Sequence, residues 1–322
     1  MNRLIASLAV ALATTTAAIA QEYPTKPITM LVPFAAGGPT DTVARLTAEA
    51  MSKTLGQNVL VENLPGAGGT IAAGRVAESD PDGYTILVHH IGMSTAPTLY
   101  RQLRFDPVTA FAPLGLVTEA PMTIVARPDF GASTLAELIQ TIKADSEAIT
   151  YANAGIGAAS HLCGMLFMST IGAQMTTVPY KGNGPIMTDL MGSQIDMTCD
   201  QATNTAGALQ EKQIKGYAVT AAERQAAIPE LPTAAEAGLP NFELSVWHGV
   251  YAPAGTPDAV LAKLTASLQA AVEDEAMGQR LNDIATLPAT KEQATPEALK
   301  ERLSSEIARW KPLIEAAGQF AD

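Results

Sequence analysis

The apolar positions of this chain fall into short continuous runs that alternate with longer amphipathic stretches. Val43, Leu46, Ala50 and Leu55 lie near one face of a helix that begins at about Thr40. Continuous apolar runs are typical of buried strands, and the first of them are at residues 28–32, 59–61 and 85–88. Strands that alternate with helices predict a mainly parallel sheet covered by helices on both faces.

The same alternation continues through the second half of the chain. Strand-like runs lie at residues 123–126, 149–153, 176–179, 195–199 and 215–220, and helical periods at 135–143 and 160–170. Toward the end, apolar residues spaced by three and four predict helices at 261–272 and 299–317, with Pro296 near the start of the second. We therefore predict a second domain of the same α/β class.

Two segments are candidates for the places where the chain crosses between the domains, near residues 121–128 and 244–253. With crossings in these segments, residues 21–122 and 249–322 form one predicted domain and residues 123–248 form the other. No long linker or low-complexity tract interrupts the chain, so we expect both crossings to be ordered.

The N-terminus has the pattern of a secretory signal peptide. A positive start at Arg3, an apolar run over residues 4–13 and small residues at Ala18 and Ala20 predict that residues 1–20 are removed. The run is shorter than the roughly 20 apolar residues of a membrane span. An uncleaved anchor or a buried first helix is the alternative. We expect export to the periplasm, cleavage near Ala20, and no membrane insertion of the mature chain.

The mature chain is expected to be acidic. Without Arg3 it has 19 basic and 32 acidic side chains, a formal net charge of −13. This balance argues against nucleic acid as a partner, because phosphates require Lys and Arg for neutralisation. It does not exclude a small anionic ligand, since backbone N–H groups at one site act locally.

The two cysteines are Cys163 and Cys199. An exported protein meets an oxidising compartment, and the even count favours a disulfide, with two separate buried thiols as the alternative. There is no C-x-x-C motif, so neither a thioredoxin-type redox site nor a zinc ribbon is supported.

One Gly-rich turn follows the first predicted strand and opens a helix. Small residues let backbone N–H groups approach a ligand closely, and a helix N-terminus favours an anion. A tight turn with an N-cap and no ligand is the alternative. The candidate binding residues of this turn are Phe34, Ala35, Ala36, Gly37, Pro39, Thr40 and Asp41.

A second Gly-rich turn has the same place between a strand and a helix. It nearly matches the dinucleotide motif G-x-G-x-x-G, but Ser160 occupies the last position, so a carboxylate fits better than a pyrophosphate. Its candidates are Asn153, Gly155, Ile156, Gly157, Ala158, Ala159 and Ser160. In a third stretch, residues 65–70, Gly68 either lines a cleft or belongs to a bare turn.

Catalytic and metal signatures are missing. The sequence contains no G-x-S-x-G elbow, no H-E-x-x-H helix and no phosphate loop of the G-x-x-x-x-G-K-[ST] type. His89 and His90 end a predicted strand, so we expect them to point to opposite sides and not to share a metal. We predict no enzyme, no cofactor and no metal site.

Several motifs together resemble the Bug receptors, the periplasmic substrate-binding proteins of tripartite tricarboxylate transporters. The matching residues are Tyr23-Pro24, residues 26–28, 32–41, 61–63, 65–69, 81–85, 179–182 and 252–257. Within that family the chain looks most like the aspartate-binding member, on residues 89–92, 153–157, 160–163 and 199–201. Both cysteines lie in these matching segments, and their joint presence also supports the disulfide.

The resemblance implies a periplasmic-binding-protein type II-like fold, with two Rossmann-like domains that close on the ligand. One turn from each domain grips a carboxylate, with help from ordered water. Neither turn contains an Arg, so backbone N–H and hydroxyl groups would bind the carboxylate. The remaining candidates are Gly68 and His90, with Asp200 and Gln201 as acceptors for a ligand ammonium; Asp200 is alternatively a structural cap.

The resemblance also implies membrane transporter subunits as partners, and we expect a monomer. The ligand is expected to be a small carboxylate, with aspartate first. The alternatives are an exported hydrolase with an atypical site, and a ligand sensor for a membrane signalling protein.

Overall fold

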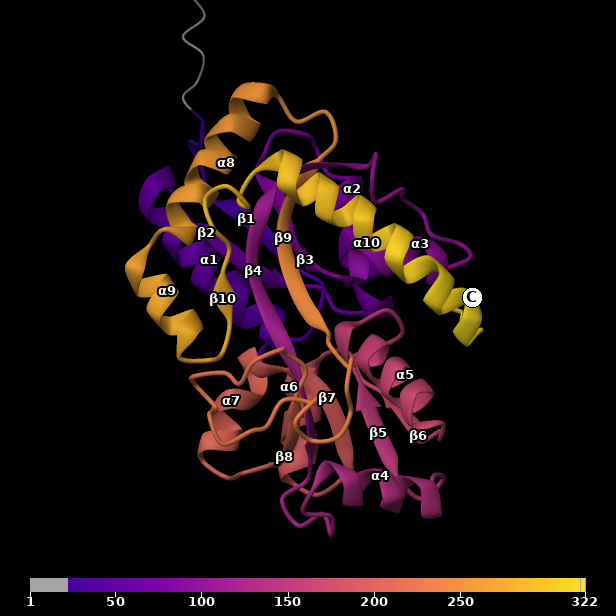
Figure 1. Ribbon diagram of the computed structural model, residues 1–322. Helices are drawn as coiled ribbons and strands as arrows, with labels where there is room; N and C mark the ends of the chain where they lie inside the picture. The colour runs from indigo at the N-terminus through magenta and orange to yellow at the C-terminus, as the bar shows by residue number, and fades with distance from the viewer. Residues whose placement is uncertain (1–22, 319, 322) are drawn as a thin grey trace, which may run out of the picture.

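A computed structural model describes residues 23–318 and 320–321 of the chain (Figure 1). The predicted signal peptide lies outside the described residues. The elements follow in the order β1 (Ile28–Val32), α1 (Pro39–Leu55), β2 (Val59–Asn63), η1 (Ala67–Gly69), α2 (Thr70–Ala77), β3 (Thr85–His90), α3 (Gly92–Leu99), β4 (Phe111–Ala126), α4 (Leu135–Ala144), β5 (Thr150–Asn153), α5 (Ala159–Ile171), β6 (Thr176–Pro179), α6 (Asn183–Met191), β7 (Met197–Gln201), α7 (Ala202–Gln210), β8 (Lys215–Val219), β9 (Ser245–Pro253), α8 (Asp258–Val272), α9 (Glu275–Asn282), β10 (Leu287–Pro288) and α10 (Pro296–Ala317).

Local sequence signals account for several element ends. The side chain of Thr295 accepts a hydrogen bond from the N–H of Ala298, and Pro296 begins α10 as predicted. Gly56 follows the last residue of α1, and its left-handed conformation (φ 66°) suits a residue without a side chain. None of the helices in the described part of the chain is long and apolar enough to cross a membrane.

The strands form one path in the order β2-β1-β3-β9-β4-β7-β5-β6, and β8 and β10 also pair with β4. β1 is parallel to β2 and β3, and β5 is parallel to β6 and β7. The two strands at the centre, β4 and β9, are antiparallel to each other and to their other neighbours. The sheet is therefore mixed, and the prediction of a mainly parallel sheet is wrong at its centre.

β4 connects two groups of elements. Its residues from Phe111 to Pro121 pair with β9, and those from Met122 to Ala126 pair with β7 and β8. The sequence indicated only its second part, because Pro113, Gly115 and Pro121 interrupt the first part. Figure 1 shows β4 and β9 running between the two groups.

This arrangement supports the two-domain division as a proposal. The first domain would comprise residues 21–122 and 249–322, with helices α1–α3 and α8–α10, and the second residues 123–248, with α4–α7. In Figure 1 the helices of the first group surround the upper part of the sheet and those of the second group the lower part.

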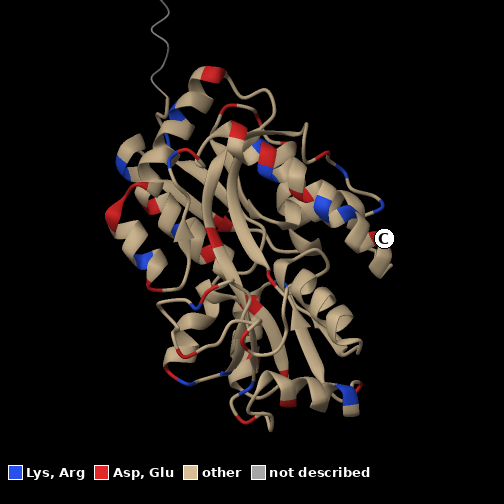
Figure 2. Ribbon diagram, viewed as in Figure 1, with Lys and Arg blue, Asp and Glu red and all other residues tan. Residues whose placement is uncertain are grey.

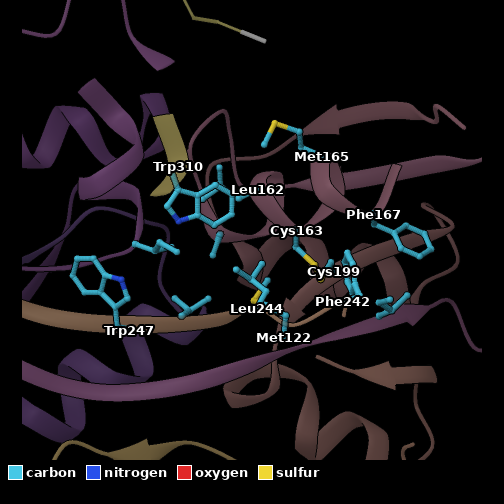
Figure 3. Close-up of a cluster of buried hydrophobic side chains, with 14 of the residues drawn as sticks. Met122, Leu162, Cys163, Met165, Phe167, Cys199, Phe242, Leu244, Trp247 and Trp310 are labelled. Carbon is cyan, nitrogen blue, oxygen red and sulfur yellow. A yellow bond between two sulfur atoms is a disulfide. The ribbon is translucent and has the colours of Figure 1, made fainter. Parts of the chain in front are cut away.

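One hydrophobic cluster includes side chains from both groups. Trp247 of β9 and Trp310 of α10 are fully buried in it, together with Leu162 of α5 and Phe242 (Figure 3). The predicted disulfide between Cys163 and Cys199 is present in the same cluster and joins α5 to β7.

Candidate ligand-binding cleft

The turn before α1 is held in shape by Asp41. The carboxylate of Asp41 accepts hydrogen bonds from the backbone N–H of Gly37 at 2.9 Å, from the guanidinium of Arg45 and from the amide of Asn63. Burial alone would raise the pKa of Asp41, but these hydrogen bonds lower it below its usual value. Asp41 therefore stabilises the turn, and the groups of the turn that remain for a ligand are those of its backbone.

The turn before α5 has a similar internal framework. Gly155 (φ 101°) and Gly157 (φ 87°) adopt conformations that favour glycine. The side-chain oxygens of Asn153 and Ser160 accept hydrogen bonds from the N–H groups of Gly155 and Ala154, both at 2.9 Å. The N–H groups of Ala159 and Ser160 lie in the first turn of α5, where a helix provides no backbone acceptor.

Each turn contacts the opposite half of the molecule, where the two halves are the groups of elements on either side of the sheet centre described above. The backbone N–H of Ala35 donates to the carbonyl oxygen of Lys181 at 3.1 Å. A Cβ atom on Gly68 would lie 1.9 Å from the carbonyl oxygen of Ile156, so that glycine makes a very close approach. The two halves are therefore closed against each other, with both Gly-rich turns at their junction.

The edge of this junction is open beside the first turn. A hollow of about 680 Å³ lies where Ala36 and Gly37 meet α6 and α7, and Gly184 and Asn204 contribute to its lining. The two turns contain no Lys or Arg, and the guanidinium of Arg45 beside the first turn is paired with Asp41. Figure 2 shows Lys and Arg scattered over both halves. Backbone N–H groups and helix dipoles are what the turns offer to an anion.

Three buried histidines lie beside the first turn. The ring of His90 stacks on Phe34, with the ring centroids 4.7 Å apart, and those of His89 and His248 lie 5.1 Å and 6.1 Å from it. The prediction that His89 and His90 point to opposite sides is wrong, because the strand ends at His90 and the chain turns into α3. Among the described residues no group of three His, Cys, Asp or Glu side chains could hold a metal ion.

These histidines are neutral hydrogen-bonding groups. Burial lowers the pKa of His89 to about 4 and that of His248 to about 3, and it holds the pKa of His90 well below its usual value. The N–H of Gly92 donates to Nδ1 of His90 at 2.9 Å. The proton of the neutral ring is therefore on Nε2, which is a donor.

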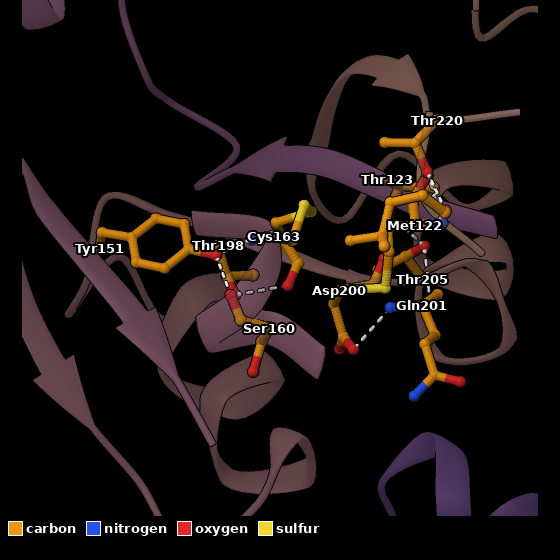
Figure 4. The surroundings of a disulfide bond; sticks show 12 residues. Met122, Thr123, Tyr151, Ser160, Cys163, Thr198, Asp200, Gln201, Thr205 and Thr220 are labelled. Atoms are coloured by element: carbon orange, nitrogen blue, oxygen red, sulfur yellow. Dashed lines mark hydrogen bonds between the residues drawn. A yellow bond between two sulfur atoms is a disulfide. The ribbon is translucent and has the colours of Figure 1, made fainter. Parts of the chain in front are cut away.

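Asp200 and Gln201 end β7 at the same junction (Figure 4). Oδ1 of Asp200 accepts from the side-chain amide of Asn183 and from the N–H of Gln201, and Oδ2 accepts from the amide of Asn204. Burial raises the pKa of Asp200 to about 7. Asn183 in turn accepts from the Ser160 hydroxyl at 3.4 Å, which links the second turn to β7.

Sequence reasoning missed Tyr100 and Asn183 as members of the junction. The Tyr100 hydroxyl contacts Ile156, and Asn183 lies between the second turn and Asp200. A signal for Asn183 was present, because it stands between Gly182 and Gly184 directly before α6. No local signal marks Tyr100.

Comparison with known proteins connects this chain to one family. The profile described as "Tripartite tricarboxylate transporter family receptor" matches residues 43–319. The solved structure of the periplasmic binding protein BugD is 47% identical, with a TM-score of 0.91 over 93% of this chain and 100% of that one. Both comparisons cover nearly all of the described fold.

Two solved structures from Rhodopseudomonas palustris are also similar. MatC with bound malate is 40% identical, with a TM-score of 0.88 over 91% of this chain and 100% of MatC. Rpa4515 with adipate is 32% identical, with a TM-score of 0.87 over 92% of this chain and 99% of Rpa4515. The described fold is therefore the mixed α/β, type II-like fold of periplasmic binding proteins. The chain belongs to the Bug family of tripartite tricarboxylate transporter receptors, which are non-enzymatic solute-binding proteins of the periplasm.

Proposed function

We propose that this chain is the periplasmic receptor of a tripartite tricarboxylate-type transporter and that it binds a small carboxylate, aspartate first, by closure of two domains. The observation that carries the proposal is the position of two helix N-terminal turns at one closed junction. Each turn comes from a different half, so a ligand between them would be held only when the halves meet.

The two turns have the chemistry of an anion site. Backbone N–H groups at the starts of α1 and α5 have no acceptor within their helices, and both helix dipoles place positive charge there. Nε2 of His90 adds a donor, and the hydroxyls of Thr40 and Ser160 hold the two turns in shape through their hydrogen bonds with His248 and Asn183. In the absence of a bidentate Arg, ordered water would complete the hydrogen bonds of the carboxylate.

The proposed ligand residues are those predicted from the sequence. They are Phe34, Ala35, Ala36, Gly37, Pro39, Thr40, Asp41, Gly68, His90, Asn153, Gly155, Ile156, Gly157, Ala158, Ala159, Ser160, Asp200 and Gln201. Within this set Asp41 and Asp200 would act by holding the shape of the site, because their carboxylates already accept several hydrogen bonds.

Relatives support the ligand class. MatC is described with malate and Rpa4515 with adipate, both dicarboxylates. The identity to BugD and the resemblance of residues 89–92, 153–157 and 199–201 to the aspartate-binding member support aspartate. The closed receptor would then present its ligand to the membrane subunits as a monomer and without a cofactor.

A thermal-shift titration of the mature protein tests this function. We expect L-aspartate, and more weakly other C4 dicarboxylates, to raise the melting temperature in a saturable way. Ligand at a hundredfold excess over Kd stabilises a protein by about 2.7 kcal/mol. NMR of the same samples should show unchanged ligand, since a receptor has no turnover. Absence of any shift with aspartate, malate, succinate and adipate would contradict the proposal.

A further inference from the structure

Gln201 has a buried acceptor that nothing in the described part of the chain satisfies. Its side-chain oxygen Oε1 has no hydrogen-bond partner there, and the residue is only 2% exposed. Buried polar atoms are nearly always paired, because an unpaired one loses its hydrogen bond to water without replacement. Two other buried atoms share this condition, Nε1 of Trp247 and the hydroxyl of Tyr251, but both belong to the interior of β9.

The position of Gln201 connects its acceptor to the cleft. Gln201 is the last residue of β7 and directly precedes α7, which packs against α1 of the opposite half. In Figure 4 its side chain extends away from the disulfide and toward a ribbon in the indigo of the N-terminal part. Asn204, in the first turn of α7, lines the hollow beside Ala36 and Gly37, so Gln201 lies at the junction next to the first Gly-rich turn.

The neighbouring Asp200 is not an equivalent acceptor. Both of its oxygens already accept hydrogen bonds from Asn183, Asn204 and the backbone of Gln201. These bonds hold the end of β7 in place and leave Oε1 of Gln201 as the acceptor that still needs a donor. A carboxylate ligand alone cannot supply one at neutral pH, because an ionised carboxylate is only an acceptor.

We propose that Oε1 of Gln201 accepts a hydrogen bond from an ammonium or hydroxyl group next to a ligand carboxylate. The receptor then selects amino- or hydroxy-dicarboxylates over unsubstituted dicarboxylates of the same length. This inference rests on the proposed carboxylate-binding function and adds a specificity-determining residue to it. A site with a buried acceptor rejects a ligand that lacks the matching donor, because the acceptor would remain unpaired in the complex.

Three ligands that differ only at this carbon test the proposal by isothermal titration. L-Aspartate has an ammonium group, L-malate a hydroxyl group and succinate neither. We expect the wild-type receptor to bind aspartate and malate at least roughly tenfold more tightly than succinate. Equal affinities for the three would overturn the role of Gln201 while the carboxylate-binding function stands. Absence of binding by all three would instead contradict that function.

Two variants then test whether Gln201 is the residue that causes this ligand preference. In Gln201→Leu the preference over succinate should shrink to within about threefold, since no acceptor remains. In Gln201→Glu the ratio of aspartate to malate affinity should rise, because a carboxylate pairs with an ammonium group better than with a hydroxyl group. Gln279→Leu, at an exposed position of α9, is the matched control and should keep wild-type ratios. Unchanged ratios in both Gln201 variants would overturn the proposal.

Discussion

The hydroxyl of Tyr100 donates a hydrogen bond to the carbonyl oxygen of Ile156 at 2.6 Å and so joins the two halves of the molecule. Burial raises the pKa of Tyr100 to about 12, so the hydroxyl keeps its proton at every pH at which the receptor would work. The backbone of Tyr100 is itself anchored, because it forms a β-bridge with Ala321 near the end of the chain. Tyr100 is therefore a fixed donor on one half that holds the Gly-rich turn of the other.

Replacing this donor should weaken ligand binding without unfolding the protein. In Tyr100→Phe we expect a two- to tenfold higher Kd for L-aspartate, the equivalent of a net hydrogen bond of about 0.5–1.5 kcal/mol. Isothermal titration measures this change. Tyr84→Phe is the control, because the Tyr84 hydroxyl bonds to Thr25 within one half. Equal affinities of the two variants would show that the bond to Ile156 does not favour the closed state.

The close approach of Gly68 to Ile156 gives a stricter test of closure. Gly68 has φ of 59°, and a Cβ atom there would overlap the Ile156 backbone oxygen. Gly68→Ala should therefore block closure and raise the Kd for aspartate by roughly a hundredfold or more, because few molecules would reach the binding-competent state.

Gly56→Ala is a matched control for that variant. Gly56 has a similar φ of 66°, and its Cβ would meet no atom within 4 Å. Both variants should lose about 1–2 kcal/mol of folding stability from the left-handed backbone. Only Gly68→Ala should lose affinity for aspartate. In small-angle scattering with ligand, this variant should have a more open shape than Gly56→Ala. Tight binding by Gly68→Ala would contradict the closed arrangement as the bound state.

The disulfide should contribute to both stability and binding. Cys163 and Cys199 are 36 positions apart in the sequence. Closing a loop of that length lowers the entropy of the unfolded chain and so stabilises the fold by about 4 kcal/mol. The double variant Cys163→Ala, Cys199→Ala should unfold at correspondingly lower denaturant concentration. Its aspartate affinity should also fall, since the bond fixes α5 against the strand that ends in Asp200 and Gln201. An unchanged denaturation midpoint would refute this role.

Asp200 should make stability depend on pH in an unusual direction. Its pKa is raised from 3.8 to about 7, so the folded state holds a proton that the unfolded state has released. Folding stability from this residue is therefore present near pH 4 and is lost as pH rises to about 7, on the order of 4 kcal/mol in total.

The measurement for Asp200 is a comparison with Asp200→Asn by urea denaturation at several pH values. The free energy of unfolding of the wild type minus that of the variant should fall between pH 4 and 7 and then level off. The histidines affect both proteins equally, so their titration cancels in the difference. A difference independent of pH would mean that the Asp200 carboxyl has an ordinary pKa in the folded protein.

Local patterns predicted most of the elements and both Gly-rich turns. Their signals are short-range: a strand, a run of small residues and a helix start follow one another within about ten positions, as from Ile28 to Asp41. The disulfide was also predictable, from compartment and residue count. The elements and turns depend on neighbours in sequence and the disulfide on compartment and residue count, and the structure agrees with these predictions.

Features that depend on distant pairing were not predictable in the same way. The length of β4 and its antiparallel partners follow from contacts with β9, more than 100 residues away, and Pro113 and Gly115 conceal its first half. Tyr100 belongs to the site only because closure brings Ile156 to it. The clustering of His89 and His90 likewise depends on a turn at the end of β3 that strand alternation does not describe.

The central claim is that the junction of the two halves binds one small carboxylate. Isothermal titration of the ligand-free mature receptor with L-aspartate tests it most directly. The account predicts saturable binding to a single site, with the affinity strongly reduced in Gly68→Ala and preserved in Gly56→Ala. Absence of binding by aspartate and by every other C4 dicarboxylate, or equal binding by both glycine variants, would contradict it.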